Sequence, residues 1–269
     1  MLAIVIDRMY RTRFSVGMLI LAIIFIFGGG IASAQNTQNF VINDFTQVYQ
    51  LSKQASGISA ATVNEYISAT FPSYDQNHGI LRALPQKYNG VSLHVKPISV
   101  KDTAYGANTE GQAINFTSQT ENGNTVLKIG DPDIYVRGAQ QYHITYTMQN
   151  VIRTYDDHDE LYINVNGTQW QQPISSVSSI IAMPSSLGSL VDKSKCFTGV
   201  QGSSNSFCKT SVNTLGNTTE FRTTSLEPFA AGENLSVVLW FPKGTFVVAG
   251  PSFIERFLPF IIAGTVAAL

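Results

Sequence analysis

The most constraining feature of the sequence is a run in which apolar and polar residues alternate. The apolar members at positions 142, 144, 146 and 148 are Tyr, Ile, Tyr and Met, and polar residues separate them. Successive side chains of a β-strand point to opposite faces, so the run predicts a strand with one buried face. The same alternation recurs over 161–166 and 235–241, and further strand candidates are Phe40–Leu51, Ala60–Phe71, Val91–Lys96 and Ile174–Met183.

A hairpin is predicted where Asn122-Gly123 separates Ala113–Ser118 from Thr125–Ile129. This dipeptide favours a type I′ turn, because both of its residues accept a positive φ. Between the two ends of the chain, no stretch shows a capped stripe of apolar residues at helical spacing. The pattern therefore predicts an all-β fold: one antiparallel β-sandwich domain over residues 35–250, immunoglobulin-like in general architecture.

The first 34 residues have the three parts of a secretory signal. Arg8, Arg11 and Arg13 precede an apolar run from Phe14 to Phe27, and Ala32-Ser33-Ala34 matches a signal-peptidase site. Residues 1–34 are predicted to be a signal peptide or an N-terminal membrane anchor helix. Because basic residues flank the cytoplasmic side of such segments, residues 35–250 are expected on the extracytoplasmic side of the cell membrane.

The other end of the chain is also apolar, with no charge from Phe257 to Leu269. This run is shorter than the roughly 20 residues that cross a bilayer. The favoured interpretation is that residues 251–269 begin a C-terminal transmembrane helix that is cut short. A packed C-terminal helix and a lipid-anchor signal are the alternatives.

The charge of the chain bears on its partners. Its 17 basic and 18 acidic residues make up 13% of the sequence and give a net charge of −1. Soluble domains usually carry about 25% charged residues. Without clustered basic residues, a nucleic-acid partner is not expected. The lipid bilayer is the partner that the two apolar ends predict.

The two cysteines, Cys196 and Cys208, flank a loop rich in glycine and serine over Gly199–Ser206. In an exported protein, two such cysteines are expected to form a disulfide. A metal site is the alternative, but it would need further His or Cys ligands, and none lies between Pro184 and Leu269.

An acidic run, Asp156, Asp157, His158, Asp159 and Glu160, is the densest polar cluster. Its carboxylates are candidates for a Ca²⁺ site, but the spacing of a calcium-binding loop is missing. A solvated turn is the favoured interpretation, and no metal and no cofactor are predicted. No catalytic constellation is recognisable either, so the chain is not expected to be an enzyme.

Several segments, taken in order, resemble one family. The segment from His78 to Pro85 reads HGILRALP, Lys128–Asp133 reads KIGDPD, and Asp156–Val165 reads DDHDELYINV. Together with Asn166–Trp170, the two-cysteine loop and the closing FPKG, they resemble the predicted bacterial membrane proteins called domain of unknown function 2207. The resemblance implies a signal or anchor helix, an extracytoplasmic β-sandwich and transmembrane helices. It implies no activity.

The family motif of His78, Gly79, Arg82 and Pro85 suggests a structural role. We expect Arg82 to pair with Asp157 or Glu160, since a bidentate arginine–carboxylate bond would fix a loop. Two functions remain open. The favoured one is a binding, interaction or sensing module that is anchored in the membrane and recognises an envelope protein or glycan. The alternative is a metal- or carboxylate-dependent hydrolase of envelope polymers, which predicts that His78 and His158 converge in one pocket.

Overall fold

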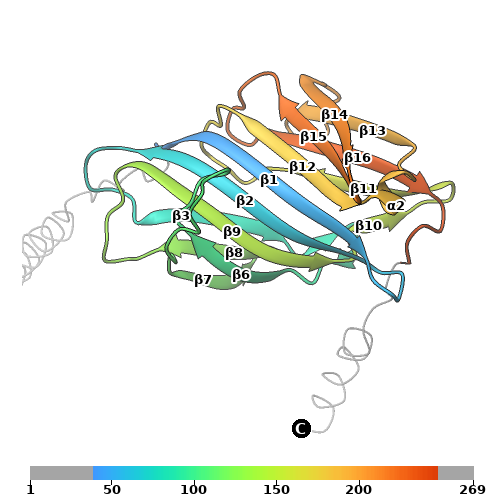
Figure 1. The fold of residues 1–269 in the computed structure, drawn as a ribbon. Helices are drawn as coiled ribbons and strands as arrows, with labels where there is room; N and C mark the ends of the chain where they lie inside the picture. The colour runs from blue at the N-terminus through green and yellow to red at the C-terminus, as the bar shows by residue number, and fades with distance from the viewer. Residues whose placement is uncertain (1–38, 248–269) are drawn as a thin grey trace, which may run out of the picture. The chain divides into compact units, whose positions relative to one another are not determined.

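The computed structural model describes residues 39–247, and this part of the chain is almost entirely β-structure. The two predicted terminal segments, 1–34 and 251–269, lie outside the described residues. Within 39–247, no helix is long and apolar enough to span a bilayer. The largest element is a seven-stranded sheet, drawn in Figure 1. Its spatial order is β14 (Cys208–Leu215), β15 (Thr218–Ser225), β12 (Val177–Pro184), β1 (Val41–Lys53), β2 (Ser59–Phe71), β9 (Gly138–Gln149) and β6 (Lys96–Lys101).

Three smaller sheets and one short helix complete the described structure. The four-stranded sheet runs β10 (Ile152–Thr154), β11 (His158–Asn164), β16 (Asn234–Pro242) and β13 (Lys193–Gly199). The three-stranded sheet runs β3 (Gly79–Pro85), β8 (Asn124–Gly130) and β7 (Phe116–Glu121). A two-stranded ribbon joins β4 (Lys87–Tyr88) to β5 (Val91–Ser92), and the helix α2 covers Ser185–Gly188.

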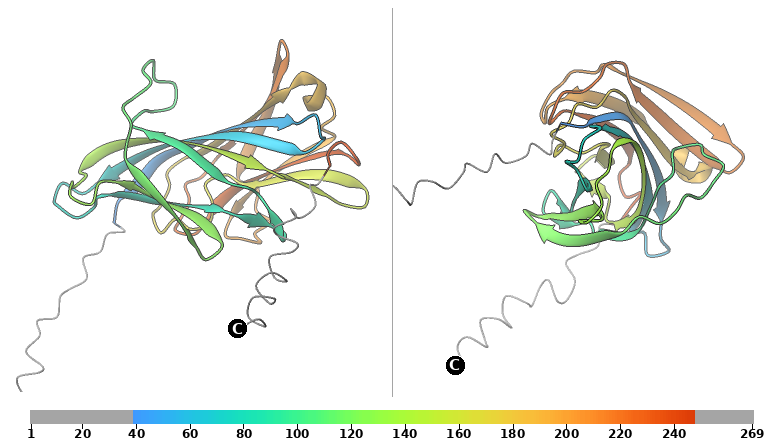
Figure 2. Two further views of the ribbon diagram at one scale, coloured as in Figure 1. Left: turned by 90° about the horizontal axis from the view of Figure 1, so that it is seen from below. Right: turned by 90° about the vertical axis from the view of Figure 1, so that its left-hand side faces the viewer.

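The core lies on the inner face of the large sheet, against the four-stranded and three-stranded sheets (Figure 2). Strand β9 shows how the sequence produces this layer. Tyr142, Ile144, Tyr146 and Met148 are all buried, while their neighbours are half-buried or exposed. The alternation predicted for this strand is confirmed. Strand β16 is different, because it is buried on both faces as far as Val238.

The predicted hairpin is also confirmed. β7 and β8 pair across a turn in which Asn122 and Gly123 have φ angles of 49° and 76°. Two other expectations fail. β1 and β12 pair in parallel, so the large sheet is mixed and not wholly antiparallel. The strand expected over Val91–Lys96 is interrupted, because His94 adopts a φ of 45°, outside the strand region.

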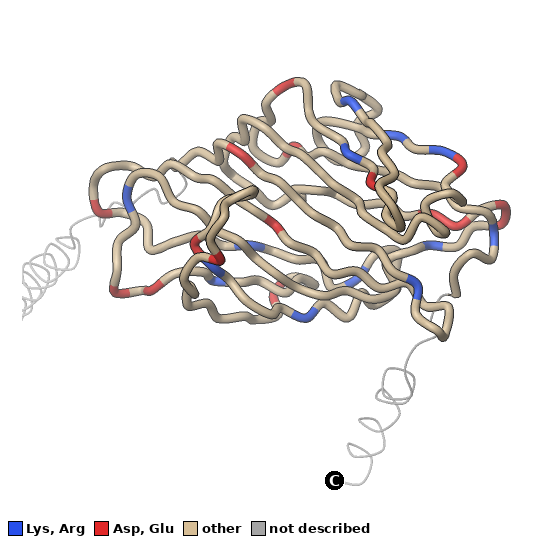
Figure 3. The backbone as a smooth tube through the Cα atoms, in the orientation of Figure 1, with Lys and Arg blue, Asp and Glu red and all other residues tan. Residues whose placement is uncertain are grey.

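The two cysteines join two of the sheets. Cys196 lies in β13, at an edge of the four-stranded sheet, and Cys208 begins β14, at an edge of the large sheet. A disulfide links them, with their Cα atoms 6.3 Å apart. The cross-link therefore ties the two layers together at one side of the core. Figure 3 shows that basic and acidic residues are interspersed along the described chain.

Candidate functional site

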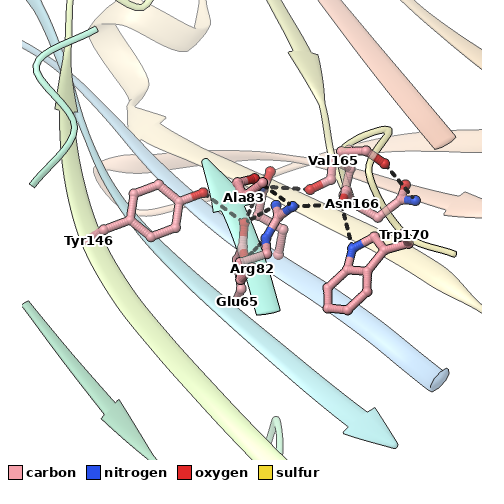
Figure 4. Close-up of polar contacts among 9 residues, drawn as sticks. Glu65, Arg82, Ala83, Tyr146, Val165, Asn166 and Trp170 are labelled. Atoms are coloured by element: carbon pink, nitrogen blue, oxygen red, sulfur yellow. Dashed lines mark hydrogen bonds and ion pairs between the residues drawn. The ribbon is translucent and has the colours of Figure 1, made fainter. Parts of the chain in front are cut away.

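A buried ion pair joins β2 to β3 (Figure 4). Glu65 on β2 is fully buried, and Arg82 on β3 is 3% exposed. The guanidinium holds the carboxylate with two hydrogen bonds, from Nε to Oε2 and from Nη2 to Oε1, each 2.7 Å long. This bidentate geometry fixes β3 against the large sheet.

The strand pattern explains why Glu65 is buried. On β2, residues 61, 63, 67 and 69 are apolar and point inward, and Glu65 occupies the middle of that row. Charged side chains are almost never fully buried unless they are paired. Arg82 occupies the same kind of position on β3, between buried Ile80 and Leu84.

Two further inward side chains complete the carboxylate's surroundings. The Tyr146 hydroxyl donates a hydrogen bond of 2.7 Å to Oε1, and Gln47 Nε2 lies 3.5 Å from the same oxygen. Burial raises the pKa of Tyr146 well above its usual value, and the nearby charge of Glu65 adds to this effect. Burial is the largest single influence on Arg82 and would lower its pKa, but the charge of Glu65, its hydrogen bond and the interactions with Tyr146 together hold that pKa above the ordinary value. The arginine and the phenol therefore both keep their protons.

The network extends from Arg82 to a tryptophan. The backbone carbonyl of Asn166 accepts hydrogen bonds from Arg82 Nη1 at 2.9 Å and from Trp170 Nε1 at 2.8 Å. The side chain of Asn166 in turn holds β16, since its Oδ1 accepts a bond from the Leu235 amide. The guanidinium also lies over the rings of Phe45 and Trp170, 5.4 and 5.9 Å from their centroids. The ion pair thus positions the segment that carries Trp170.

Beside Trp170 the surface is hollowed into a groove of about 700 Å³. Three family-like segments that are distant in the sequence meet there: 78–81, 128–132 and 169–172. The groove has an apolar floor that includes Ile80, Ile129 and Phe116, and exposed polar residues lie around it. Its further lining residues are Phe40, Gln76, Asn77, Asn115 and Thr117.

Two glycines of the motifs lie against each other where the groove meets β3 and β8. Gly79 and Gly130 are cross-strand partners with φ angles of 137° and 128°. A Cβ atom on Gly79 would lie 1.8 Å from the Ile129 carbonyl oxygen, and one on Gly130 would lie 2.0 Å from that of His78. The close approach of the two strands explains why glycine stands at both positions.

The remaining predicted residues of the motif lie nearby. His78 lines the groove, with its ring 4.2 Å from the ring of Tyr135 and Nδ1 3.0 Å from the Ile134 carbonyl oxygen. Pro85 ends β3 and is exposed. His158 is not among the residues that line the groove; its ring stacks on Tyr155 and lies 4.8 Å from the ring of Trp240. The convergence of His78 and His158 that a two-histidine site requires is not found.

The acidic run divides its side chains among separate partners. Asp156 is exposed, and Asp157 contacts His158 Nδ1 at 2.6 Å. Asp159 is fully buried and accepts a hydrogen bond from the Phe246 amide, while Glu160 accepts one from Trp240 Nε1. Across residues 39–247, no three His, Cys, Asp or Glu side chains are grouped as metal ligands. Asp159 instead anchors the chain that leaves β16.

The expected pairing of Arg82 with Asp157 or Glu160 is wrong, because Glu65 holds the guanidinium. No sequence motif predicts the polar roles of Gln47, Tyr146 and Asn166. One signal was available, namely a glutamate at an inward position of the alternation in Ala60–Phe71. An unpaired charge there would be costly, so the pattern itself called for a buried cation.

Comparison with known proteins gives one family. A family model described as "Predicted membrane protein (DUF2207) N-terminal domain" matches residues 42–241. No curated protein matches the sequence.

Similar solved structures include an M1 zinc metallopeptidase from Deinococcus radiodurans, at 11% identity and a TM-score of 0.42, covering 74% of this chain and 42% of that one. Another is a putative protease from Parabacteroides distasonis, at 11% identity and 0.42, covering 74% and 40%. Leukotriene A4 hydrolase from Saccharomyces cerevisiae matches at 9% identity and 0.42, covering 76% and 30%. The chain thus spans less than half of each of these proteins, and at these scores the matches say nothing about activity.

Proposed function

We propose that this chain, which belongs to the DUF2207 family of predicted membrane proteins, is a membrane-anchored binding module of the cell envelope. Its β-rich domain would stand on the extracytoplasmic side, built as a sandwich of the large sheet and the smaller sheets. The groove beside Trp170 would recognise a protein segment or a glycan strand of the envelope.

The single observation that supports this proposal is the convergence of three motif segments in one groove. The proposal assigns no reacting atom to the ion pair or to the Asn166 carbonyl. Their hydrogen bonds hold Trp170, which lines the groove, in a fixed position. A rigid wall favours recognition, because less conformational freedom is lost on binding. Amide side chains such as Gln169 and Gln171, set beside an apolar floor, suit a ligand with many hydrogen-bonding groups. The two charged residues of the lining, Lys128 and Asp131, are of opposite sign.

The hydrolase alternative has less support. It relies on His78, His158 and the acidic run, and these side chains have different partners. A binding role does not require these side chains to lie in one pocket. The proposal therefore includes no catalytic step and no cofactor.

The test is photocrosslinking of the full chain in its own membrane. A photoreactive amino acid replaces Leu81, which lines the groove and is 58% exposed. We expect a covalent adduct on illumination. Digestion of the adduct by a muramidase would identify a glycan, and peptides of a second protein would identify a protein segment.

The matched control places the same amino acid at Leu226, which is 65% exposed and does not line the groove. We expect little adduct there. Equal labelling at both positions, or none at Leu81, would contradict the proposal.

A further inference from the structure

The large sheet ends on each side in an edge strand, and the two edges differ in how they are protected. Edge strands present unpaired backbone groups, and proteins protect them with lysine, proline or a bulge. β6 carries all three: a lysine at each end, Pro97 inside it, and a register shift between Pro97 and Ser99. β14 pairs with β15 without a register shift, and over Thr210–Leu215 it has neither a charge nor a proline. Within the described residues, no strand pairs with its other side.

The backbone groups of Thr210, Val212 and Thr214 point toward this open side. The Leu226 amide donates a hydrogen bond to the Phe207 carbonyl, in the same register that joins β14 to β15. Along an antiparallel ladder, hydrogen-bonded pairs alternate with pairs that are not hydrogen-bonded. Counting from Phe207, every second residue of β14 therefore bonds to β15, and the residues between them turn their N–H and C=O groups outward.

The side chains of the same three residues form a row that is left partly uncovered. Residues directly opposite each other in an antiparallel pair share a face of the sheet. Val212 lies opposite Phe221, whose side chain is buried in the core, yet Val212 itself is 55% exposed. On either side of Val212, a threonine of β14 pairs with a threonine of β15, with hydroxyl oxygens 2.9 and 3.0 Å apart. The inner face of the large sheet thus stays open at β14.

The row of threonine, valine and threonine reads the same in both directions, which suits pairing with itself. When two copies of β14 run antiparallel about a two-fold axis at Val212, Thr210 of one copy lies opposite Thr214 of the other. Threonine pairs of this kind already join β14 to β15, and they stabilise strand pairing. The one charged residue of β14, Lys209, would lie opposite Leu215 and not opposite another lysine. A two-fold interface needs a self-complementary surface such as this.

We propose that β14 is a dimerisation edge, which pairs antiparallel with β14 of a second copy of this chain. The two large sheets then become one continuous sheet. Each hydrogen-bonded pair exchanges two bonds, so the three outward-facing residues would add about six bonds in all. Val212, which is exposed in the single chain, would be covered at the two-fold axis. The proposal does not depend on the groove, because no residue of β14 lines it.

The test is cysteine crosslinking of the full chain in its own membrane. The disulfide consumes both native cysteines, so an added cysteine is the one free thiol of the described chain. Val212→Cys places two thiols across the axis, where the paired Cα atoms would lie about 5.5 Å apart, within the roughly 4.4–6.8 Å that a disulfide spans. We expect a covalent dimer on mild oxidation.

The register supplies matched controls on the same strand. Thr210→Cys and Thr214→Cys should each fail to crosslink alone, because the two copies of either thiol would lie four residues apart along the strands, about 13 Å. When the two variants are co-expressed, they should crosslink to each other. Equal crosslinking by Thr214→Cys alone and by Val212→Cys, no dimer from Val212→Cys, or its crosslinking to a different protein only, would overturn the proposal.

A second measurement needs no added thiol and uses two differently tagged copies of the chain. Val212→Lys in both copies sets like charges opposite each other at the axis, so the amount that co-purifies should fall about fivefold. The matched control is Ile98→Lys, since Ile98 is 54% exposed and lies in β6, the protected edge. This change should leave co-purification unaltered. One Val212→Lys copy and one Val212→Glu copy should co-purify again, and failure of these two folded variants to do so would contradict pairing at Val212.

Discussion

At the scale of single residues, the Glu65–Arg82 pair gives the sharpest prediction about stability. Arg82→Met leaves the fully buried Glu65 carboxylate without its cation. Breaking such a pair from one side costs about 3–5 kcal/mol, because the remaining charge is uncompensated. We expect urea unfolding, followed by the fluorescence of Trp170 and Trp240, to show a loss of this size.

Two controls separate this effect from ordinary loss of a side chain. The double variant Glu65→Leu/Arg82→Met removes both charges and should be more stable than Arg82→Met alone. Lys101→Ala breaks a pair whose Glu110 partner is 92% exposed, and should cost less than about 1 kcal/mol. A double variant less stable than Arg82→Met would contradict the proposed reason for the loss.

His143 predicts how stability depends on pH. Its ring stacks on Tyr66 at 4.2 Å, and Nε2 lies 2.9 Å from Asn64 Oδ1. Burial lowers its pKa, and the positive charge of Lys101 on the neighbouring strand lowers it further. The unfolded chain therefore binds the proton more readily than the folded protein. The free energy of unfolding should fall as pH drops below about 6.5, the pKa of an unperturbed histidine.

The measurement is urea unfolding at several pH values between 7 and 5. His143→Gln should reduce the slope over this range, since glutamine does not titrate. An unchanged slope in this variant would assign the pH dependence to other groups.

Residue identity predicted the motif but not its contacts. The segment HGILRALP predicts a structural role for Arg82, and the high charge density of the acidic run suggests a partner there. The partner in the structure lies 17 residues earlier, at an inward position of β2. Which inward arginine meets which inward glutamate depends on how the sheets stack, and no local pattern contains that information.

At the scale of elements, the strands that the sequence predicts are those in which apolar and polar residues alternate regularly. β1, β2, β9, β12 and the β7–β8 hairpin were predicted to within a few residues. The β14–β15 hairpin was not, because β14 is exposed along most of its length and has no apolar face to alternate. A strand without a buried face leaves little trace in the sequence.

The disulfide carries a prediction for this weakly packed element. Cys196→Ala/Cys208→Ala frees β14 from β13, and the 12-residue separation of the cysteines suggests a loss of about 3 kcal/mol in the chain-entropy model. We also expect faster amide hydrogen exchange in β14, because few of its side chains are buried. Unmodified protein treated with a reductant should behave like the double variant. Unchanged exchange in β14 would mean that pairing with β15 alone holds the strand.

At the scale of the whole molecule, the order of strands could not be read from the sequence. β1 pairs in parallel with β12, which lies more than a hundred residues later in the chain. A separate three-stranded sheet is formed by β3, β8 and β7. Alternation tells which face of a strand is buried but not which strand lies beside it. The groove arises from this arrangement, so it too could not be predicted from the sequence.

The last prediction concerns the side of the membrane on which the β-rich domain stands. Residues 102–111 form a largely exposed loop between β6 and β7, and a short insertion at such a loop is usually tolerated. A site for a specific protease placed after Gly106 should be cleaved when the protease is added to intact spheroplasts. The positive-inside rule predicts that the basic N-terminal flank stays in the cytoplasm, and the proposed arrangement would then leave the loop outside. The unmodified chain should resist the protease, and a cytoplasmic marker carrying the same site should be cut only after lysis. Cleavage of the loop only after lysis would place the domain in the cytoplasm and contradict its proposed role in the envelope.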